Sequence, residues 1–289
     1  MILLATYNKD PWDVNKANLT LDALYSLWLE KKAPKLGTSS QQSLKTAYRH
    51  CKALAPLKYT SIKAYHMQET IDNCELSYST QGAIKALWGH LDKFALELDI
   101  STRNHSCLLQ AAPIPETTKK PFSEDEIKLI WRMKDVPWVD SILFLLYSGF
   151  RISEMLDLQK ESIDLDAGTI TGGTKTKSGK DRIVPIHSKI HGIVDARLAD
   201  TGDYLFSHSG RKCNATAYRT FWSGIMQKAT IQHTPHDCRH TFRSRLDSAG
   251  ANKRCIDLMM GHKSKDVGER VYTHKTIDEL KTAIELVTD

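Results

Sequence analysis

The spacing of apolar residues divides the chain into stretches with different expected structures. Up to residue 112, apolar positions recur every three or four residues, which is the period of an amphipathic helix. This period predicts a small bundle of helices. We expect one helix capped by Thr20, one beginning at Ser39 or Ser40, one over residues 62–71, and one capped by Ser79 or Thr80.

A proline-rich stretch interrupts this pattern. The sequence PIPETTKKP at residues 113–121 is typical of an extended linker. Directly after it, Ser123 and Glu126 have the spacing of a capping box that opens a new helix. We therefore predict a helical domain over residues 13–112 and a second domain over residues 122–289.

The pattern of the second domain is mixed. The apolar run from Ser141 to Tyr147 indicates a buried helix that ends at Gly149. From Ile163 to Ile186, short β-branched runs separated by glycines predict antiparallel strands. Further helices are expected near residues 188–198, over 215–228, from Pro235, and in the tail from Thr276. The predicted fold class is α+β and mainly helical, with a small antiparallel sheet.

Composition limits the class of protein. Apolar residues make up 41% of the 289 residues and charged residues 26%, as in a soluble globular protein. The apolar run from Ile142 to Tyr147 is far too short to span a membrane, and the first residues lack the pattern of a secretory signal. Six cysteines without CxxC pairs indicate reduced thiols in an intracellular protein. The net charge of +6 points only weakly to nucleic acid.

Candidate chemistry is concentrated between Pro235 and His274. His236 and Arg239 are three residues apart, so on a helix they share a face. His262 follows a glycine, and Tyr272 lies further on. A phenol is a poor nucleophile at its ordinary pKa of about 10, but nearby cations favour the phenolate and also bind phosphate. The stretch therefore predicts a tyrosine site that reacts with a phosphate.

Two earlier segments add candidates to this site. Arg151 follows the buried helix, and Glu154 comes three residues later, either as a surface ion pair or as the partner of a partly desolvated arginine. Lys175, Lys177 and Lys180 lie at the tip of the predicted hairpin. A lysine there can reach a phosphate or protonate a leaving oxygen, although the segment alone is more typical of a solvated turn.

The order of these motifs resembles the tyrosine recombinase (phage integrase-type) family. RISE follows an apolar helix, a lysine hairpin runs into VPI, and HxxRH, GH and YTH come next. The resemblance is close from Phe122 to Thr282 and looser over residues 13–112, where it implies a SAM-like helical domain that binds core DNA. LLATYNKDPWDV near the start resembles the end of a longer integrase that carries an extra N-terminal arm-DNA-binding domain. We expect that this chain lacks such a domain.

The resemblance assigns roles to individual residues. It implies Tyr272 as the nucleophile, Lys177 as the general acid, Glu154 as a supporting acid, and Arg151, His236, Arg239 and His262 as groups that bind the phosphate. Tyr272 follows His262 by ten residues where the family more often has nine, and Gly268 can absorb the extra residue. Further DNA contacts are expected from Lys175, Lys180, Arg211 and Lys212.

The implied reaction is cleavage and rejoining of double-stranded DNA through a 3′-phosphotyrosine, which conserves bond energy and needs no ATP. We expect no metal ion and no cofactor. The resemblance also implies a cytoplasmic, nucleoid-associated protein of a bacterial or phage-infected cell. The family also implies a homotetramer on two duplexes, accessory DNA-bending or directionality proteins, and the integration or excision of a mobile element or prophage. The tail from Thr276 is then expected to pack in trans on the next protomer, although a terminal amphipathic helix usually docks on its own core.

Three other functions remain open at the level of sequence. A metal-dependent hydrolase could use His233, His236 and His240, although we expect no acidic ligand near them. A type IB topoisomerase-like enzyme would share the tyrosine chemistry but relax supercoils. A simple DNA-binding module would leave Arg151, Lys177 and Tyr272 unexplained.

Overall fold

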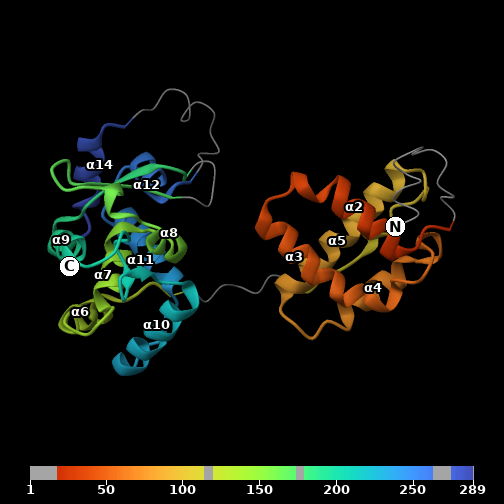
Figure 1. Cartoon of the computed structure of the whole chain (residues 1–289), viewed down its shortest axis with the longest axis horizontal. Coiled ribbons are helices and arrows are strands. Elements are labelled where there is room, and N and C mark those ends of the chain that lie inside the picture. Colours follow the sequence, from red (N-terminus) through yellow and green to blue (C-terminus); the bar gives the residue numbers. More distant parts are fainter. Residues whose placement is uncertain (1–17, 114–119, 174–178, 263–274, 289) are drawn as a thin grey trace. The chain divides into compact units, whose positions relative to one another are not determined.

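The computed structural model describes residues 18–113, 120–173, 179–262 and 275–288 (Figure 1). The chain forms two compact units, residues 1–117 and residues 118–289. Lys175, Lys177 and Tyr272 lie outside the described residues.

The first unit is a bundle of helices, as the apolar spacing predicts. Thr20 caps the first of them, and its Oγ1 accepts a hydrogen bond from the Ala23 amide at 3.2 Å. Two predicted starts are wrong, because the backbone turns helical earlier: Gly37 and Ser77, both extended, precede the second and fourth helices. The elements are α2 (Leu21–Lys31), η2 (Ala33–Lys35), α3 (Thr38–Tyr48), η3 (Arg49–Leu54), η4 (Tyr59–Ser61), α4 (Ala64–Asp72), α5 (Tyr78–Glu97) and η5 (Ser106–Leu108).

Buried polar groups tie the helices of this unit together. The indole of Trp88 on α5 donates to the Thr70 hydroxyl on α4 at 2.9 Å. Asp92 is fully buried, and its carboxylate accepts from the Tyr59 hydroxyl and the Ser106 amide, both at 2.6 Å. Because a buried carboxylate is costly without such donors, these bonds favour a single packing of the bundle.

The second unit combines helices with two small antiparallel sheets, which confirms the predicted fold class. The sheet order is β1-β2-β3 in one and β4-β5 in the other. The elements are α6 (Glu124–Arg132), α7 (Val139–Ser148), α8 (Ile152–Leu156), η6 (Lys160–Ser162), β1 (Ile163–Asp164), β2 (Thr169–Gly172), β3 (Arg182–Pro185), η7 (Ser188–Ile190), α9 (His191–Ala199), β4 (Ser207–His208), β5 (Arg211–Lys212), α10 (Ala215–Ala229), α11 (Pro235–Ser248), α12 (Lys253–Met260) and α14 (Ile277–Ile284).

Helix α7 forms the centre of this unit, and all of its residues except Asp140 are buried. It packs along α11, and Figure 1 shows the two helices side by side. Gly149 ends α7 in the left-handed conformation at φ 66°, close against the ring of Phe242. A glycine is required there, because a Cβ would lie 2.4 Å from that ring. The turn then delivers Arg151 to the start of α8.

In this structure of one chain the tail packs on its own unit, and docking in trans on a neighbouring protomer stays a prediction. Helix α14 contacts β3 and α12, and Leu280 and Ile284 are buried in the core of the second unit. His187 Nε2 lies 3.0 Å from the Val287 carbonyl oxygen, and Glu285 accepts from the amide and hydroxyl of Ser188, both at 2.7 Å. An amphipathic helix buries its apolar stripe on the nearest available core.

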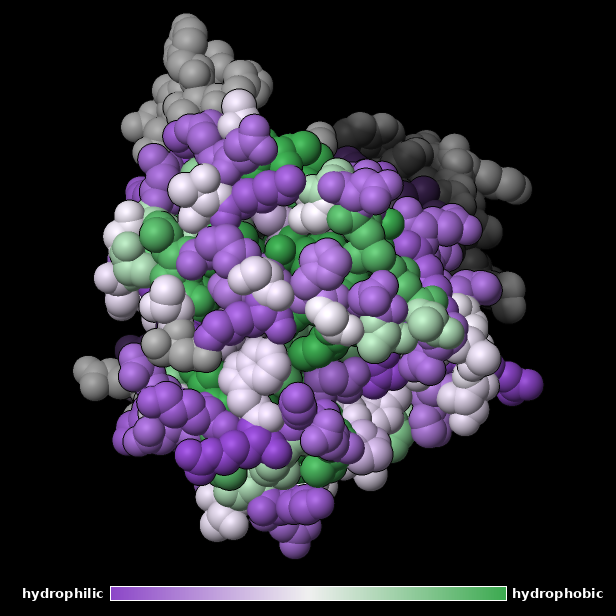
Figure 2. All heavy atoms as spheres, turned by 90° about the vertical axis from the view of Figure 1, so that its left-hand side faces the viewer, coloured by the Kyte–Doolittle hydropathy of each residue, from purple (hydrophilic) through white to green (hydrophobic). Residues whose placement is uncertain are grey.

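Hydrophilic side chains cover most of the face of the second unit that Figure 2 presents, with small apolar areas between them. Among the described residues, no helix is long and apolar enough to cross a membrane.

Candidate active site

Arg239 lies at the centre of the predicted site. It projects from α11 and is only 3% exposed. Its Nη1 donates to the Gly149 carbonyl at 2.5 Å, and its Nη2 donates to the Met260 carbonyl and lies 3.2 Å from His262 Nε2. The guanidinium is thus held by the ends of α7 and α12 at once. Pro235 lies in the first turn of α11, as the sequence predicts, and Thr234 caps this helix.

Arg151 and Glu154 form the pair expected from their spacing. The Arg151 guanidinium donates to Glu154 Oε1 at 2.8 Å, and its amide donates to Oε2 at 3.0 Å. Glu154 is 1% exposed, whereas Arg151 is half-buried. Burial alone raises the pKa of Glu154, but Arg182 and then Arg151 outweigh it and hold that pKa below its ordinary value. The structure therefore supports the interpretation that Glu154 is the partner of a partly desolvated arginine rather than half of a surface ion pair.

Arg182 is a member of this cluster that sequence reasoning missed. It is buried on β3, donates to Glu154 Oε2 at 2.8 Å and to the Met259 carbonyl at 2.8 Å, and lies over the Phe150 ring at 4.4 Å. Ile183, the next residue, is 38% exposed. Successive side chains of a strand point to opposite faces, and either set of alternate residues could face the core here. The available signal was that Arg182 alternates with the apolar residues Val184 and Ile186, which are buried in the structure.

His262 lies directly after the end of α12. Gly261 there has φ 63°, and the His262 amide donates to the Asp257 carbonyl at 2.8 Å. The Arg243 guanidinium lies 3.3 Å from His262 Nδ1, and Asp257 Oδ1 lies 3.8 Å from the same nitrogen. Burial, then Arg239 and Arg243, lower the pKa of His262, while Asp257 acts in the opposite direction. The imidazole is thus neutral at neutral pH.

The base of the lysine hairpin lies against this turn. A Cβ on Gly261 would lie 2.8 Å from the Gly179 Cα, and a Cβ on Gly173 would lie 1.9 Å from the Gly179 carbonyl oxygen. Gly173 and Gly179 flank the undescribed segment that contains Lys177. Gly173 thus lies against Gly179, and Gly179 lies against the turn before His262, where the close approach of the backbones leaves no room for a Cβ.

The histidines at the start of α11 are arranged differently from the phosphate-binding set. His236 is exposed, and its ring makes an edge contact with His240 at 4.7 Å between centroids. The expectation that no acid lies near these histidines is wrong for His233: its Nε2 is 3.2 Å from Glu126 Oε2. Among the described residues, no three His, Cys, Asp or Glu side chains are grouped so that they could hold a metal ion.

The other predicted DNA contacts lie apart in the fold. Arg211 and Lys212 form β5 of the two-stranded sheet, and Lys212 pairs with Asp157 at 2.5 Å, which raises the pKa of the lysine. Lys180 is exposed beside the hairpin base. Arg211 is exposed as well. The ion pair therefore distinguishes Lys212 from Arg211 and Lys180.

Positive charge dominates the cluster. Burial, followed by repulsion from Arg151 and Arg182, lowers the pKa of Arg239 to about 9, so the guanidinium is still charged at neutral pH. Arg239 donates to two carbonyls and lies beside an imidazole. Among the described residues, the carboxylates that contact the cluster are Glu154, which binds Arg151 and Arg182, and Asp257, which lies near His262. A partly desolvated group with excess positive charge is suited to bind an anion.

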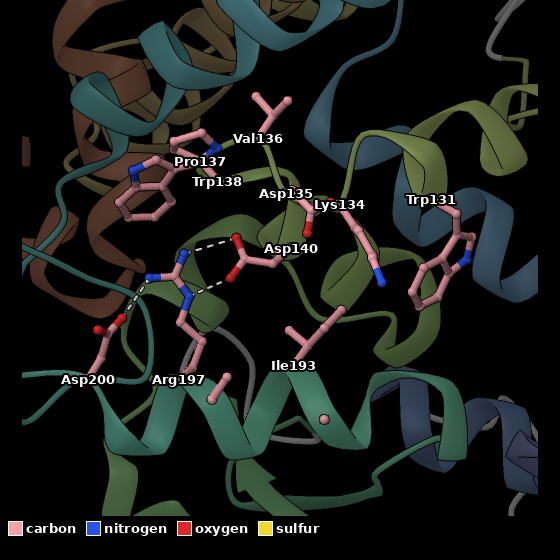
Figure 3. A pocket seen from close by; sticks show the side chains of 12 residues that line it. Trp131, Lys134, Asp135, Val136, Pro137, Trp138, Asp140, Ile193, Arg197 and Asp200 are labelled. Carbon is pink, nitrogen blue, oxygen red and sulfur yellow. Dashed lines mark hydrogen bonds and ion pairs between the residues drawn. The ribbon is translucent and has the colours of Figure 1, made fainter.

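A separate hollow lies between α9 and the connection from α6 to α7 (Figure 3). Arg197 at its wall is neutralised by Asp140, with bonds of 2.5 and 2.9 Å, and by Asp200 at 3.2 Å. Its pKa is raised, because these carboxylates outweigh burial. The described residues that line the hollow include none of the predicted catalytic residues. The hollow is thus not the predicted site.

Comparison with known proteins agrees with this arrangement. Residues 123–279 match the Phage integrase family, and the chain belongs to this family. Tyrosine recombinase XerA of Pyrococcus furiosus is 34% identical over 189 residues, which cover 61% of this chain and 65% of that protein. The match thus spans slightly less than two thirds of the length of this relative. The resemblance to tyrosine recombinases of the integrase type is confirmed.

Two solved structures share the fold. The Tn1549 transposon integrase in complex with circular intermediate DNA has a TM-score of 0.73, with 20% identity, over 92% of this chain and 99% of that one. A lambda integrase tetramer bound to a Holliday junction has a TM-score of 0.72, with 13% identity, over 91% of this chain and 82% of that one.

Proposed function

We propose that the chain is a site-specific DNA recombinase that cleaves and rejoins DNA through a covalent bond between Tyr272 and a 3′-phosphate. The observation that carries the proposal is the buried Arg239, which is held beside Arg151 and His262 in a cluster with excess positive charge. A phosphodiester in the transition state supplies the anion that this cluster lacks. Membership of the Phage integrase family supports the same conclusion.

The roles of the described residues follow from their donors. Arg151 and Arg239 each present guanidinium N–H groups that can bind the non-bridging oxygens of the phosphate. His262 adds a neutral imidazole beside Arg239. His236 is exposed on the first turn of α11, the helix that carries Arg239. Glu154 orients Arg151 and Arg182 rather than the substrate. Loss of one such donor to a transition-state oxyanion typically slows a reaction by about 10²–10³-fold.

The covalent step requires two residues outside the described ranges. We propose that Tyr272 loses its phenolic proton to solvent, that its Oη attacks the phosphorus, and that the bond from phosphorus to the 5′-oxygen breaks. Lys177 would give its proton to the departing 5′-oxygen, leaving a free 5′-hydroxyl. Rejoining is the reverse of these steps, with a 5′-hydroxyl as the nucleophile. The position of Gly179, at one end of the segment that contains Lys177, against Gly261 supports Lys177 in this role.

The first unit and the assembly are part of the same proposal. We propose that residues 13–112 bind core DNA, that residues 113–121 are the linker, and that the protein acts as a homotetramer on two duplexes. The lambda integrase tetramer on a Holliday junction has the same fold, which supports this assembly. Integration or excision of a mobile element or prophage is the process that we propose, in line with the fold shared with the Tn1549 transposon integrase.

Covalent trapping tests the proposal. The protein is incubated in EDTA with a nicked suicide duplex that carries its site, and adducts that resist SDS are measured. We expect an adduct that is lost in Tyr272→Phe and retained in Tyr204→Phe, the matched control. Absence of an adduct on a duplex that the protein binds would instead support a simple DNA-binding module. Loss of cleavage only when EDTA is present would indicate a metal-dependent hydrolase.

A further inference from the structure

His262 lies between two guanidinium groups from one face of α11. Its Nε2 is 3.2 Å from Arg239 Nη2, and its Nδ1 is 3.3 Å from Arg243 Nη1. The two arginines are four residues apart, so they lie one helical turn from each other. The backbone of His262 is fixed by the bond to the Asp257 carbonyl. The imidazole is therefore in contact with an arginine on each side.

These two contacts cannot both be hydrogen bonds. A guanidinium only donates, and a neutral imidazole has one nitrogen that accepts and one that carries a proton. One contact is thus an N–H···N bond, and the other places two N–H groups opposite each other. Which nitrogen accepts determines whether Nε2 or Nδ1 of His262 can donate to a substrate.

The surrounding groups decide between the two tautomers. Arg239 already donates to the carbonyls of Gly149 and Met260, so it does not need the imidazole as an acceptor. Asp257 would favour a proton on Nδ1, but its Oδ1 is 3.8 Å away, beyond hydrogen-bond distance. Arg243 at 3.3 Å is closer to Nδ1 and has the opposite effect.

We propose that Arg243 is a positioning residue that keeps His262 Nδ1 as an acceptor, so that Nε2 carries the proton and donates to the scissile phosphate. The Nε2–H of His262 and the Nη2–H of Arg239 are then two donors 3.2 Å apart. These two donors repel each other, and a phosphate oxygen shared between them would accept from both. This consequence for catalysis rests on the proposed recombinase function, whereas the tautomer does not.

The charges around His262 determine how the effect depends on pH. Among the described residues, Arg239 and Arg243 face it from α11, Arg151 from the start of α8, and Asp257 from α12. Removing Arg243 takes away one of the cations that disfavour imidazolium and leaves Asp257 as the competitor for Nδ1. Without Arg243, we expect the Nδ1–H tautomer to be populated above the pKa of His262. Imidazolium, with a proton on both nitrogens, forms below that pKa.

NMR of the full-length free protein tests the tautomer directly. Long-range ¹H–¹⁵N spectra distinguish the two tautomers, and the His262 signals are those lost in His262→Gln. Near pH 8, roughly one unit or more above an ordinary histidine pKa, we expect the Nε2–H form in the wild type and in Arg243→Lys. We expect a shift to Nδ1–H in Arg243→Met. Arg219→Met, which removes an exposed arginine from α10, is the charge-matched control and is expected to keep Nε2–H.

Single-turnover cleavage of the suicide duplex at saturating protein tests the consequence for catalysis. Near pH 8, we expect the cleavage rate of Arg243→Met to be at least about tenfold lower than that of the wild type. The deficit is expected to shrink as the pH falls, because imidazolium again offers an Nε2–H. Arg243→Lys, which keeps a donor, is expected to restore the rate.

The outcomes separate this proposal from the proposed function. A wild type that is already Nδ1–H, or an Arg243→Met protein that keeps Nε2–H, overturns the role of Arg243. An equal deficit at every pH, or weaker DNA binding with an unchanged cleavage rate, also overturns it and makes Arg243 a simple DNA contact. If the wild type forms no adduct at all, the recombinase function fails, while the NMR result still decides the tautomer.

Discussion

Glu154 accepts a 2.8 Å hydrogen bond from Arg182, a residue 28 positions later in the chain. The same carboxylate binds Arg151 at 2.8 Å, so one buried acid joins the start of α8 to strand β3. Arg182 also donates to the carbonyl of Met259, near the end of α12. The positions of Arg151, the hairpin base and the turn before His262 are therefore linked through one carboxylate.

Glu154→Gln is expected to destabilise the protein strongly. The side chain of Glu154 is fully buried and that of Arg182 is 4% exposed, so removing the negative charge leaves buried cations uncompensated. Loss of one partner of a buried ion pair typically costs about 3–5 kcal/mol. Denaturant unfolding measures the change in the free energy of unfolding. The control Glu161→Gln, at an exposed position, is expected to change it by less than about 0.5 kcal/mol.

The same pair predicts a pH dependence. The pKa of Glu154 is lower in the folded state, so its contribution is fully present above its unfolded pKa of about 4.3 and is lost as the pH falls through the folded pKa. We expect the stability of the wild type to fall more steeply than that of Glu154→Gln in this acid range. Parallel curves for the two proteins would contradict this account of the pair.

Gly149→Ala is expected to impair both stability and the site. The residue has φ 66°, and the new Cβ would lie 2.4 Å from the Phe242 ring. Left-handed backbone and overpacking together are expected to cost about 2 kcal/mol or more. The Gly149 carbonyl also accepts from Arg239, so cleavage should slow in the fraction that remains folded. Thermal melts and covalent trapping measure the two effects.

Gly224→Ala is the matched control for that substitution. Gly224 lies within α10 of the same unit, and nothing lies within 4 Å of a Cβ at this position. Alanine in place of a helical glycine typically adds about 0.5–1 kcal/mol. A stabilised Gly224→Ala beside a destabilised Gly149→Ala would show that backbone conformation and space, rather than loss of glycine as such, decide the result.

Acidification is expected to loosen the C-terminal tail. Burial of His187 lowers its pKa, and the opposing effect of Glu285 is smaller. The docked tail therefore favours the neutral ring. A detached tail binds a proton near the ordinary histidine pKa of about 6.5, so docking weakens as the pH falls below that value. Hydrogen exchange of residues 276–288, measured at about pH 7.5 and about pH 5.5, should show this change.

Variants at two histidines test this explanation. His187→Gln has no titratable ring, so tail exchange should depend less on pH than in the wild type, after correction for the intrinsic exchange rate. His191→Gln, an exposed position on α9, should behave as the wild type does. If the wild-type tail stayed equally protected at both pH values, His187 would not control its docking.

Arg211 and Lys212 are expected to contribute unequally to DNA binding. Both residues are exposed, but Asp157 lies 2.5 Å from the Lys212 ammonium and offsets its charge, whereas no such ion pair involves Arg211 among the described residues. If β5 contacts the DNA backbone, Arg211→Ala should reduce the slope of log affinity against log salt by about one, and Lys212→Ala by less. Fluorescence anisotropy over a salt series measures the slopes, and a larger effect at Lys212 would refute the argument.

Local sequence patterns determined the helices and turns that carry the site. Ser123 and Glu126 form the predicted capping box, Pro235 begins α11, and Gly149 ends α7. These features depend on interactions within a few residues, which a sequence pattern records directly. The pairing of Arg151 with Glu154 belongs to the same class, because both residues lie on one turn.

Tertiary structure alone decided the rest of the site. The register of β3 turned Arg182 inward and left Ile183 exposed, although either parity suits the pattern of a short strand. The packing of α11 against the end of α12 brought Arg243 and Asp257 to His262, and Glu126 reached His233 from α6. The tail packed against β3 and α12 of its own unit. Contacts between distant segments depend on packing and register, which the spacing of residues along a single chain does not contain.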